Sequence, residues 1–159
     1  MLSGPNRGLL VDTNLLVLFA VGSVNPSRIA NFKRTSKYEI RDFDLLVRVL
    51  EQWTELYTLP HVLAEVSNLT DLSGRERLRA RQILKQTISF LNEAQIASAQ
   101  AAEDPVYETL GLVDAAIAAV ARENKCAVLT DDLDLYLILQ RDRIDVVNFT
   151  HLRARALGV

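Results

Sequence analysis

The stretch GLVDAAIAAVARENKCAVLTDDLDLY, residues 111–136, combines a helix, a strand and the start of a second helix. GLVDAAIAAVA is apolar on nearly every side, which is typical of a buried helix, whereas CAVLT (126–130) has the length and content of a fully buried strand. Asp131 and Asp132 follow this strand directly, where acids suit the amino end of the next helix. The order helix, buried strand, helix is typical of an α/β domain with a parallel sheet.

Similar segments flank this stretch on both sides. GLLVD (8–12) and IDVVNF (144–149) are apolar runs of strand length, ELYTLP (55–60) is a shorter strand, and AQIASA (94–99) is expected to form another. The spacing of apolar residues predicts helices at 14–22, 42–53, 60–69, 73–94 and 105–124, the last either continuous or broken at Gly111. Alternating strands and helices predict a mostly parallel sheet that is covered by helices on both faces.

Length and composition are those of an ordinary globular domain. The chain has 159 residues, 49% apolar and 24% charged, so one domain spanning 1–159 is the default. The single cysteine, Cys126, excludes an internal disulfide framework and a cysteine-built zinc site. Near the amino end only LLVLFAVG (15–22) is uninterrupted, far short of the roughly 20 apolar residues that a membrane span needs. We therefore expect a soluble, cytoplasmic protein without a membrane segment.

Positive charge is concentrated in two segments, although the net charge of the chain is −2. Residues 22–41, expected to be either an ordered insertion or a mobile flap, contain one acid, Glu39, and five bases: Arg28, Lys33, Arg34, Lys37 and Arg41. Residues 75–85 also contain five bases, in a helix that Ser73 and Glu76 are expected to cap. Each segment alone is as consistent with a solvated surface as with a binding site, but the two together leave room for a polyanion.

Four acids occupy positions where an α/β fold brings distant segments together. Asp12 ends the first strand and Asp132 follows the strand at 126–130, and ligands of parallel sheets bind beyond such carboxyl ends. Glu65 and Asp114 lie within otherwise apolar helices. Carboxylates that converge raise one another's pKa, and a divalent cation relieves the repulsion. Oxygen ligands select hard ions such as Mg²⁺ or Mn²⁺, which bind phosphates and activate water for hydrolysis.

Each of these acids also has a simpler explanation. Asp12 and Asp132 are well placed to cap the helices that follow them. Glu65 is equally consistent with a solvated helix position. Asp114 is the hardest to explain in this way, because a lone carboxylate in a buried helix is costly unless it caps the first turn or meets a cation. The metal hypothesis therefore depends on the four acids being considered together.

In chain order, these segments resemble a PIN-domain nuclease, similar to the toxin components of bacterial type II toxin–antitoxin pairs. LLVDTNLL (9–16) is similar to the opening strand of the family and its Asp-Thr-Asn/Ser turn, and LPHVLAEVSNL (59–69) to the helix that carries a Glu. Residues 111–136 are similar to the Asp-bearing helix, the next strand and the Thr-x-Asp turn, which is the most specific match. The resemblance implies a three-layer α/β/α sandwich.

The resemblance also implies roles for individual residues. The acidic quartet of the family falls on Asp12, Glu65, Asp114 and Asp132, which would hold one or two Mg²⁺ or Mn²⁺ ions and carry the catalysis. Thr130 takes the place of the hydroxyl residue in Thr-x-Asp. Positions expected to support the site are Thr13, Asn14, Thr130 and Asp131, the last being either a spectator or an additional carboxylate.

The implied activity is hydrolysis of RNA phosphodiester bonds that leaves a 5′-phosphate and a 3′-hydroxyl. The implied partners are the RNA substrate, contacted by the bases of 22–41, a cognate antitoxin protein and a second copy of the chain in a homodimer. Two alternatives within the fold stay open: an RNA-processing nuclease that is not a toxin, and a catalytically silent module that binds nucleic acid or protein. An aspartyl-phosphate phosphotransferase is disfavoured because Asn14 stands where its second Asp would be.

Overall fold

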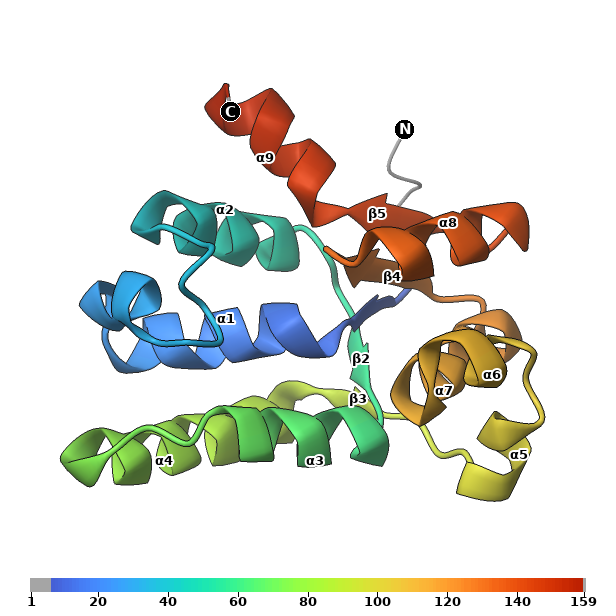
Figure 1. Cartoon of the computed structure of the whole chain (residues 1–159), viewed down its shortest axis with the longest axis horizontal. Helices are drawn as coiled ribbons and strands as arrows, with labels where there is room; N and C mark the ends of the chain where they lie inside the picture. The colour runs from blue at the N-terminus through green and yellow to red at the C-terminus, as the bar shows by residue number, and fades with distance from the viewer. Residues whose placement is uncertain (1–6, 159) are drawn as a thin grey trace.

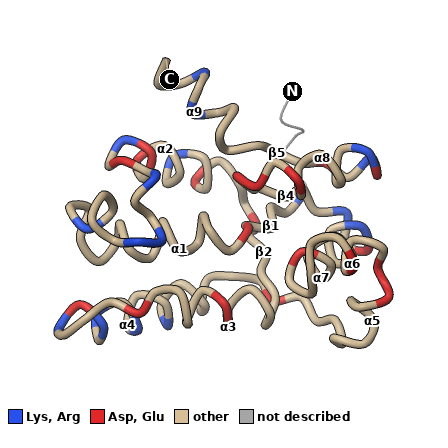
Figure 2. The backbone as a smooth tube through the Cα atoms, in the orientation of Figure 1, with Lys and Arg blue, Asp and Glu red and all other residues tan. Residues whose placement is uncertain are grey.

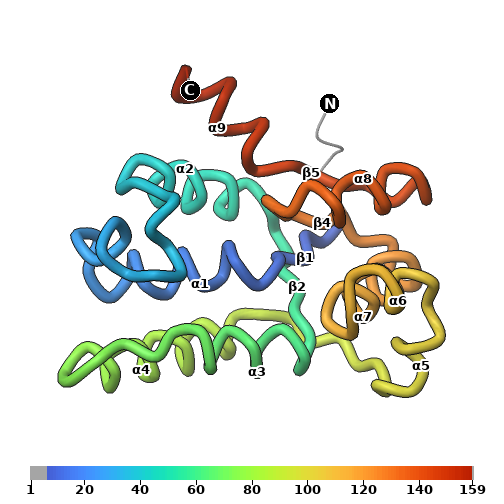
Figure 3. The backbone as a smooth tube through the Cα atoms, viewed as in Figure 1, coloured from blue at the N-terminus to red at the C-terminus, as the bar shows by residue number. Residues whose placement is uncertain are grey.

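The computed structural model, which describes residues 7–158, is built around a five-stranded parallel sheet (Figure 1). The strands are β1 (Leu9–Val11), β2 (Leu56–Thr58), β3 (Asn92–Glu93), β4 (Ala127–Thr130) and β5 (Val146–Asn148). Their order across the sheet is β3-β2-β1-β4-β5, with every neighbouring pair parallel. The chain thus builds outward from β1 to β3 and then crosses to β4 on the other side of β1 (Figure 3).

Helices cover both faces of this sheet. They are α1 (Thr13–Val24), the 3₁₀ helix η1 (Pro26–Asn31), α2 (Ile40–Glu51), α3 (Pro60–Leu69), α4 (Gly74–Phe90), α5 (Ser98–Ala102), α6 (Val106–Leu110), α7 (Leu112–Asn124), α8 (Leu133–Arg141) and α9 (Phe149–Leu157). Helices α1 to α4 lie on one side of the strands, and α5 to α8 lie on the other (Figure 1). The predicted α/β/α sandwich with a parallel sheet is therefore confirmed. None of the helices between residues 7 and 158 has the length and hydropathy to span a membrane.

The two central strands are buried from end to end. Leu9, Leu10 and Val11 of β1 have no exposed surface, and every residue of β4 is buried as well. A strand covered on both faces needs apolar side chains on both faces, so its sequence is a continuous apolar run rather than an alternating one. This constraint explains why the first and fourth strands were predicted correctly from the sequence.

Two predicted boundaries were wrong. The segment 94–99 is not a strand, since the strand β3 is only two residues long and precedes it, and α5 begins at Ser98. The helix predicted over 73–94 ends at Phe90, and Ser73 makes no side-chain capping bond. The predicted break at Gly111 is confirmed, because this residue separates α6 from α7 with φ = 92°, a conformation that glycine adopts readily.

The segment between α1 and α2 packs onto the rest of the molecule. We call residues 25–39 the strap. Three of its side chains, Ile29, Thr35 and Tyr38, are almost completely buried, and the Thr35 hydroxyl donates to the Ile29 carbonyl at 2.8 Å. A basic segment of the sequence thus has an apolar inner side, which fixes the positions from which its charges project.

One ion pair connects α9 to α2 and to the strap. Arg153 of α9 donates from Nε and Nη2 to the two carboxylate oxygens of Asp42, at 2.8 Å each, and from Nη2 to the Lys37 carbonyl at 3.5 Å. The Asp42 side chain is 1% exposed and also accepts from the Glu39 backbone amide. A carboxylate buried to this extent depends on the arginine for its compensating charge.

We expect Arg153→Ala to lower the free energy of unfolding by about 3 kcal/mol, because it leaves the Asp42 carboxylate buried without a cation. Urea denaturation followed by circular dichroism measures this loss. The matched control is Arg155→Ala on the same helix, where the exposed side chain makes no ion pair with the described residues. That variant should lose at most about 0.5 kcal/mol, and equal losses in both would contradict a specific role for Arg153.

Candidate functional site

Acidic residues gather at the carboxyl ends of β1 and β4, where the direction of strand addition reverses (Figure 2). Asp12 follows β1, is 5% exposed and caps α1. Its Oδ1 accepts from the Thr13 backbone amide at 2.7 Å, and its Oδ2 accepts from the Thr130 hydroxyl at 2.6 Å. The carboxylate is therefore held by one donor from its own turn and one from the neighbouring strand.

Thr130, the last residue of β4, connects the two acidic turns. Its hydroxyl donates to Asp12 and accepts from the Asp132 backbone amide at 3.0 Å. Asp132 in turn caps α8, since its Oδ1 accepts from the Leu135 backbone amide at 3.0 Å. Both capping interpretations of the sequence are thus confirmed; Asp132 keeps one oxygen without a hydrogen bond to the described residues, whereas both oxygens of Asp12 accept one.

Glu65 and Asp114 approach this edge from helices on opposite sides of the sheet. Glu65 lies in the middle of α3 and is half-buried. Asp114 lies in the first turn of α7, where its charge suits the helix dipole, but its carboxylate makes no hydrogen bond within the described residues. The first turn therefore explains the backbone position of Asp114 but not the absence of a partner for its side chain.

The acids act on one another electrostatically. Burial raises the pKa of Asp114 to about 7, and the nearby carboxylates of Asp12, Asp132 and Glu65 add to the shift. Burial also raises the pKa of Asp12 to about 6; the bonds from Thr130 and Thr13 oppose this shift, while Asp131 and Asp132 increase it. All four predicted acids therefore contribute to one region of negative potential.

The acids are not arranged as a complete metal-binding site. Within residues 7–158, no three Asp, Glu, His or Cys side chains converge closely enough to hold a metal ion. The donor chemistry nevertheless fits a hard divalent cation, because the cluster offers only oxygen ligands and its carboxylates destabilise one another without a counter-charge. Rotation of the side chains that lack hydrogen bonds would be needed to close the coordination shell.

The two carboxylate oxygens of Asp131 lie in different environments. Its Oδ2 accepts from the Tyr38 hydroxyl and pairs with the Lys37 ammonium at 2.6 Å, so both strap residues meet one oxygen. Its Oδ1 is buried and has no hydrogen-bond partner within the described residues. A buried oxygen without a donor beside Asp12 is a second feature that suits a cation at this edge.

The two residues expected to support Asp12 from its own turn differ in what they contact. Thr13 supplies its backbone amide to the carboxylate, while its hydroxyl is buried without a partner in the described residues. The Asn14 side chain is exposed and makes no hydrogen bond to the described residues. The supporting hydroxyl for Asp12 thus comes from Thr130, 118 residues away in the chain.

The five bases of residues 22–41 differ in the acids that they contact. Arg28 pairs with Glu76 of α4 at 2.7 Å, and Arg41 pairs with Glu39 at 2.9 Å. Lys33 and Arg34 are exposed and form no ion pair within residues 7–158, and only Lys37 reaches the acidic edge. Sequence reasoning missed Tyr38 and Arg153, because a lone tyrosine and a lone arginine carry no local signal for contacts made so far away in the chain.

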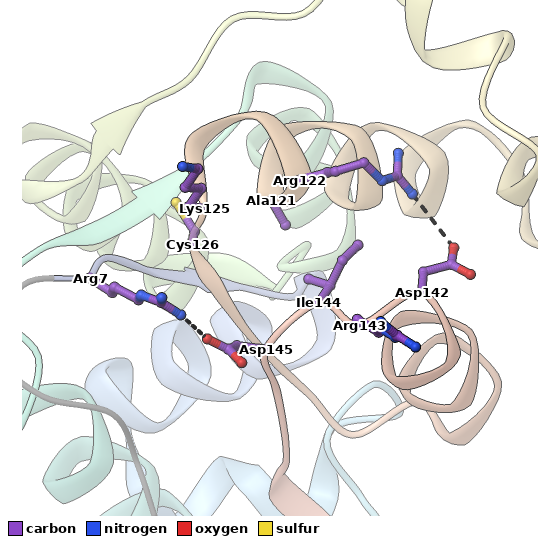
Figure 4. Close-up of a pocket in the computed structure, with 9 residues that line it drawn as sticks. All are labelled: Arg7, Ala121, Arg122, Lys125, Cys126, Asp142, Arg143, Ile144 and Asp145. Atoms are coloured by element: carbon purple, nitrogen blue, oxygen red, sulfur yellow. Dashed lines mark hydrogen bonds and ion pairs between the residues drawn. The ribbon is translucent and has the colours of Figure 1, made fainter.

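A separate cavity of about 200 Å³ lies at the opposite end of the sheet (Figure 4). Its basic side chains are partly neutralised by an ion pair from Arg7 to Asp145 and by one from Arg122 to Asp142 at 3.5 Å. None of the predicted site residues lines this cavity. The four acids therefore lie away from this cavity.

Comparisons with known proteins agree with this arrangement. A family model described as PIN domain matches residues 9–139. Among solved structures, the fold is similar to that of PAE2754 from Pyrobaculum aerophilum, with a TM-score of 0.54 over 96% of this chain and 98% of that one. The sequences are 18% identical, so this likeness concerns the fold alone. No curated protein sequence matches the chain.

The family match includes the strand that precedes Asp12, the helices that carry Glu65 and Asp114, and the turn at Thr130. It covers far more than half of the chain. The protein therefore belongs to the PIN domain family, whose members are generally nucleases.

Proposed function

We propose that the protein is an Mg²⁺- or Mn²⁺-dependent endoribonuclease, that its whole chain forms one nuclease domain, and that it acts as the toxin of a toxin–antitoxin pair. The single observation that carries the proposal is the environment of Asp114. This carboxylate is partly buried, has no hydrogen-bond donor within the described residues and lies near three other carboxylates. Such a cluster is unfavourable for folding alone, and it suits a site that binds a divalent cation.

The residues that would hold the metal are Asp12, Glu65, Asp114 and Asp132. The Asp131 carboxylate, whose Oδ1 has no hydrogen-bond partner within the described residues, is close enough to Asp12 to raise its pKa. When bound, one or two divalent ions would supply an activated water molecule and stabilise the charge that builds up on phosphorus and on the leaving oxygen. Products with a 5′-phosphate and a 3′-hydroxyl are expected.

The protein itself would orient the reacting groups. Thr130 keeps one oxygen of Asp12 engaged, which limits the directions in which the carboxylate can accept another ligand. Glu65 makes no hydrogen bond or ion pair with the described residues, so its carboxylate is available to orient a water molecule or to receive its proton. Asp132 is held at one oxygen by its helix cap and presents the other.

RNA is the proposed substrate because the strap brings one base, Lys37, to this acidic edge of a chain that is slightly acidic as a whole. The toxin role rests on the sequence resemblance alone, and a housekeeping RNA-processing nuclease is the alternative that shares the same site. A silent binding module is the less favoured alternative, since none of the four acids is missing.

We expect the purified protein to cleave structured RNA in the presence of Mn²⁺, with complete loss of cleavage on addition of EDTA. Asp12→Asn should reduce the rate by at least about a hundredfold, because it removes one charge from the cluster that binds the cation. Denaturing gels with transfer RNA, ribosomal RNA and single-stranded oligonucleotides measure the activity. The control is Asp134→Asn, an exposed acid of α8 outside the cluster, which should cleave like the wild type.

Two results would contradict this part of the proposal. Cleavage that survives EDTA would exclude a divalent metal as the essential cofactor. Tight binding of RNA that is insensitive to EDTA and never leads to cleavage would favour the silent binding module.

The raised pKa values predict a distinctive pH dependence of stability. Asp12 and Asp114 titrate near 6 and 7 in the folded protein but near 3.8 when unfolded, so the folded state binds more protons between these values. Their protonated forms therefore stabilise the fold at low pH, and this stabilisation is lost as the pH rises through 6 and 7. We expect Asp114→Asn in EDTA to raise the melting temperature much more at about pH 8 than at about pH 5, because the difference in bound protons accumulates from the unfolded pKa up to the folded one.

Thermal unfolding followed by circular dichroism measures this difference. Asp134→Asn, which removes a favourable charge from the first turn of α8, should slightly lower the melting temperature at both pH values. A shift for Asp114→Asn that is the same at both pH values would contradict a pKa of Asp114 raised by burial and by the neighbouring carboxylates.

The toxin role predicts that expression of the protein arrests bacterial growth, because cleavage of cellular RNA stops translation. Asp114→Asn should abolish the arrest while the protein accumulates to the same level. Growth curves after induction, with immunoblots for protein amount, measure both quantities. Normal growth in cells that contain a demonstrably active enzyme would instead assign the nuclease to housekeeping RNA processing.

A further inference from the structure

Two consecutive strap residues meet the acidic edge at one atom. The Tyr38 hydroxyl donates to Asp131 Oδ2, and the Lys37 ammonium lies 2.6 Å from the same oxygen. Asp131 follows β4 directly and is close enough to Asp12 to raise its pKa. The strap is therefore attached to the sheet next to the carboxylates of the proposed site.

Tyr38 is held firmly in this position. Its side chain is 1% exposed, its ring packs edge-on against Phe149 with centroids 6.4 Å apart, and the Arg153 guanidinium lies 5.5 Å from the ring centroid. Burial and the neighbouring Asp131 carboxylate raise the pKa of Tyr38, so the hydroxyl keeps its proton and acts as a donor. Tyr38 thus fixes the backbone from which Lys37 projects.

The ion pair with Asp131 leaves the Lys37 ammonium able to bind a second anion. Its side chain is 56% exposed, whereas that of Asp131 is 2% exposed, so the ammonium lies at the surface of the pair and faces solvent. A lysine ammonium has three N–H donors, and one of them suffices for Asp131 Oδ2. The remaining donors can reach an anion that approaches from solvent.

The surroundings of Lys37 are strongly negative. None of Asp12, Glu65, Asp114 and Asp132 forms an ion pair with a base in the described part of the chain. Of the other strap bases, Arg28 pairs with Glu76 of α4, and Lys33 and Arg34 pair with none of the described acids. An RNA backbone that enters this edge is repelled by the carboxylates, and Lys37 is the strap cation placed to offset the repulsion.

We propose that Lys37 binds a backbone phosphate of the RNA at the mouth of the acidic site, and that Tyr38 and Asp131 are positioning residues that hold the ammonium there. This inference rests on the proposed ribonuclease function. It assigns the general affinity of the basic segment for RNA to one residue. Asp131 is then neither a spectator nor only an additional carboxylate, because its Oδ2 holds the Lys37 ammonium in place.

The test compares Lys37→Met with Lys125→Met, which removes the same charge at the opposite end of the sheet. Cleavage of a fluorescein-labelled single-stranded RNA oligonucleotide in Mn²⁺ gives kcat and KM. Lys37→Met should raise KM about tenfold, the worth of one charge-assisted hydrogen bond, with little change in kcat. The slope of log affinity against log salt, measured by fluorescence anisotropy in Mg²⁺ with the inactive Asp114→Asn protein as background, should fall by about 0.7.

The positioning role of Tyr38 is tested by a double-mutant cycle. Tyr38→Phe keeps the ring but removes the bond to Asp131, and it should raise KM through a misplaced Lys37. The double variant Tyr38→Phe/Lys37→Met should then be no worse than Lys37→Met alone, because both changes remove the same contact. A merely structural Tyr38 gives additive effects, with a matching loss of stability in urea denaturation. Lys37→Arg, which keeps the charge, should recover most of the affinity.

The outcomes separate this inference from the proposed function. Wild-type protein that cleaves RNA, with Lys37→Met indistinguishable from Lys125→Met, overturns the role of Lys37 and leaves the nuclease intact. Wild-type protein that neither cleaves nor binds RNA in Mn²⁺ overturns the proposed function and the role of Lys37 with it. A rise in KM confined to Lys37→Met and reversed in Lys37→Arg supports the proposal.

Discussion

The hydrogen bond from the Thr130 hydroxyl to Asp12 connects two strand ends that lie 118 residues apart in the chain. Parallel strands bring their carboxyl ends to one edge, and this bond fixes how the turns that follow them are oriented. Through the same hydroxyl, Thr130 also accepts from the Asp132 backbone amide, so both acidic turns share one anchor. The positions of the capping acids, and hence of α1 and α8, depend on this arrangement.

The burial that stabilises the sheet is also what makes the acidic edge unfavourable. Asp12 must follow a fully buried strand to reach the edge, and the same environment raises its pKa by removing water. Asp114 brings a second poorly solvated carboxylate to the same place. A fold selected only for stability would place neutral side chains here. Local rules of stability are broken most often at functional sites, and the coincidence of two such carboxylates is strong support for a site that needs them.

The parts of the fold that the sequence predicted share one property, since their signal lies within a few consecutive residues. The continuous apolar runs of β1 and β4, the acids that follow them and the break at Gly111 are all of this kind. The sheet edge was not predicted because β3 has two exposed residues and no apolar pattern. The expected capping box of Ser73 failed because Glu76 instead binds Arg28, 48 residues earlier. Long-range polar contacts leave no periodic trace in a sequence.

Residues 22–41 show the same limit for function. Counting charges in the sequence predicts a basic patch, yet two of the bases of residues 22–41, Arg28 of the strap and Arg41 of α2, pair with acids away from the site. What gives Lys37 its location is Tyr38, a buried aromatic residue whose hydroxyl reaches Asp131. Tyr38 in turn packs against α9, which supplies Phe149 and Arg153. The position of the Lys37 charge at the acidic edge therefore depends on packing between the strap and α9. Because of this dependence, the number of bases in a segment is a poor measure of where an anion binds.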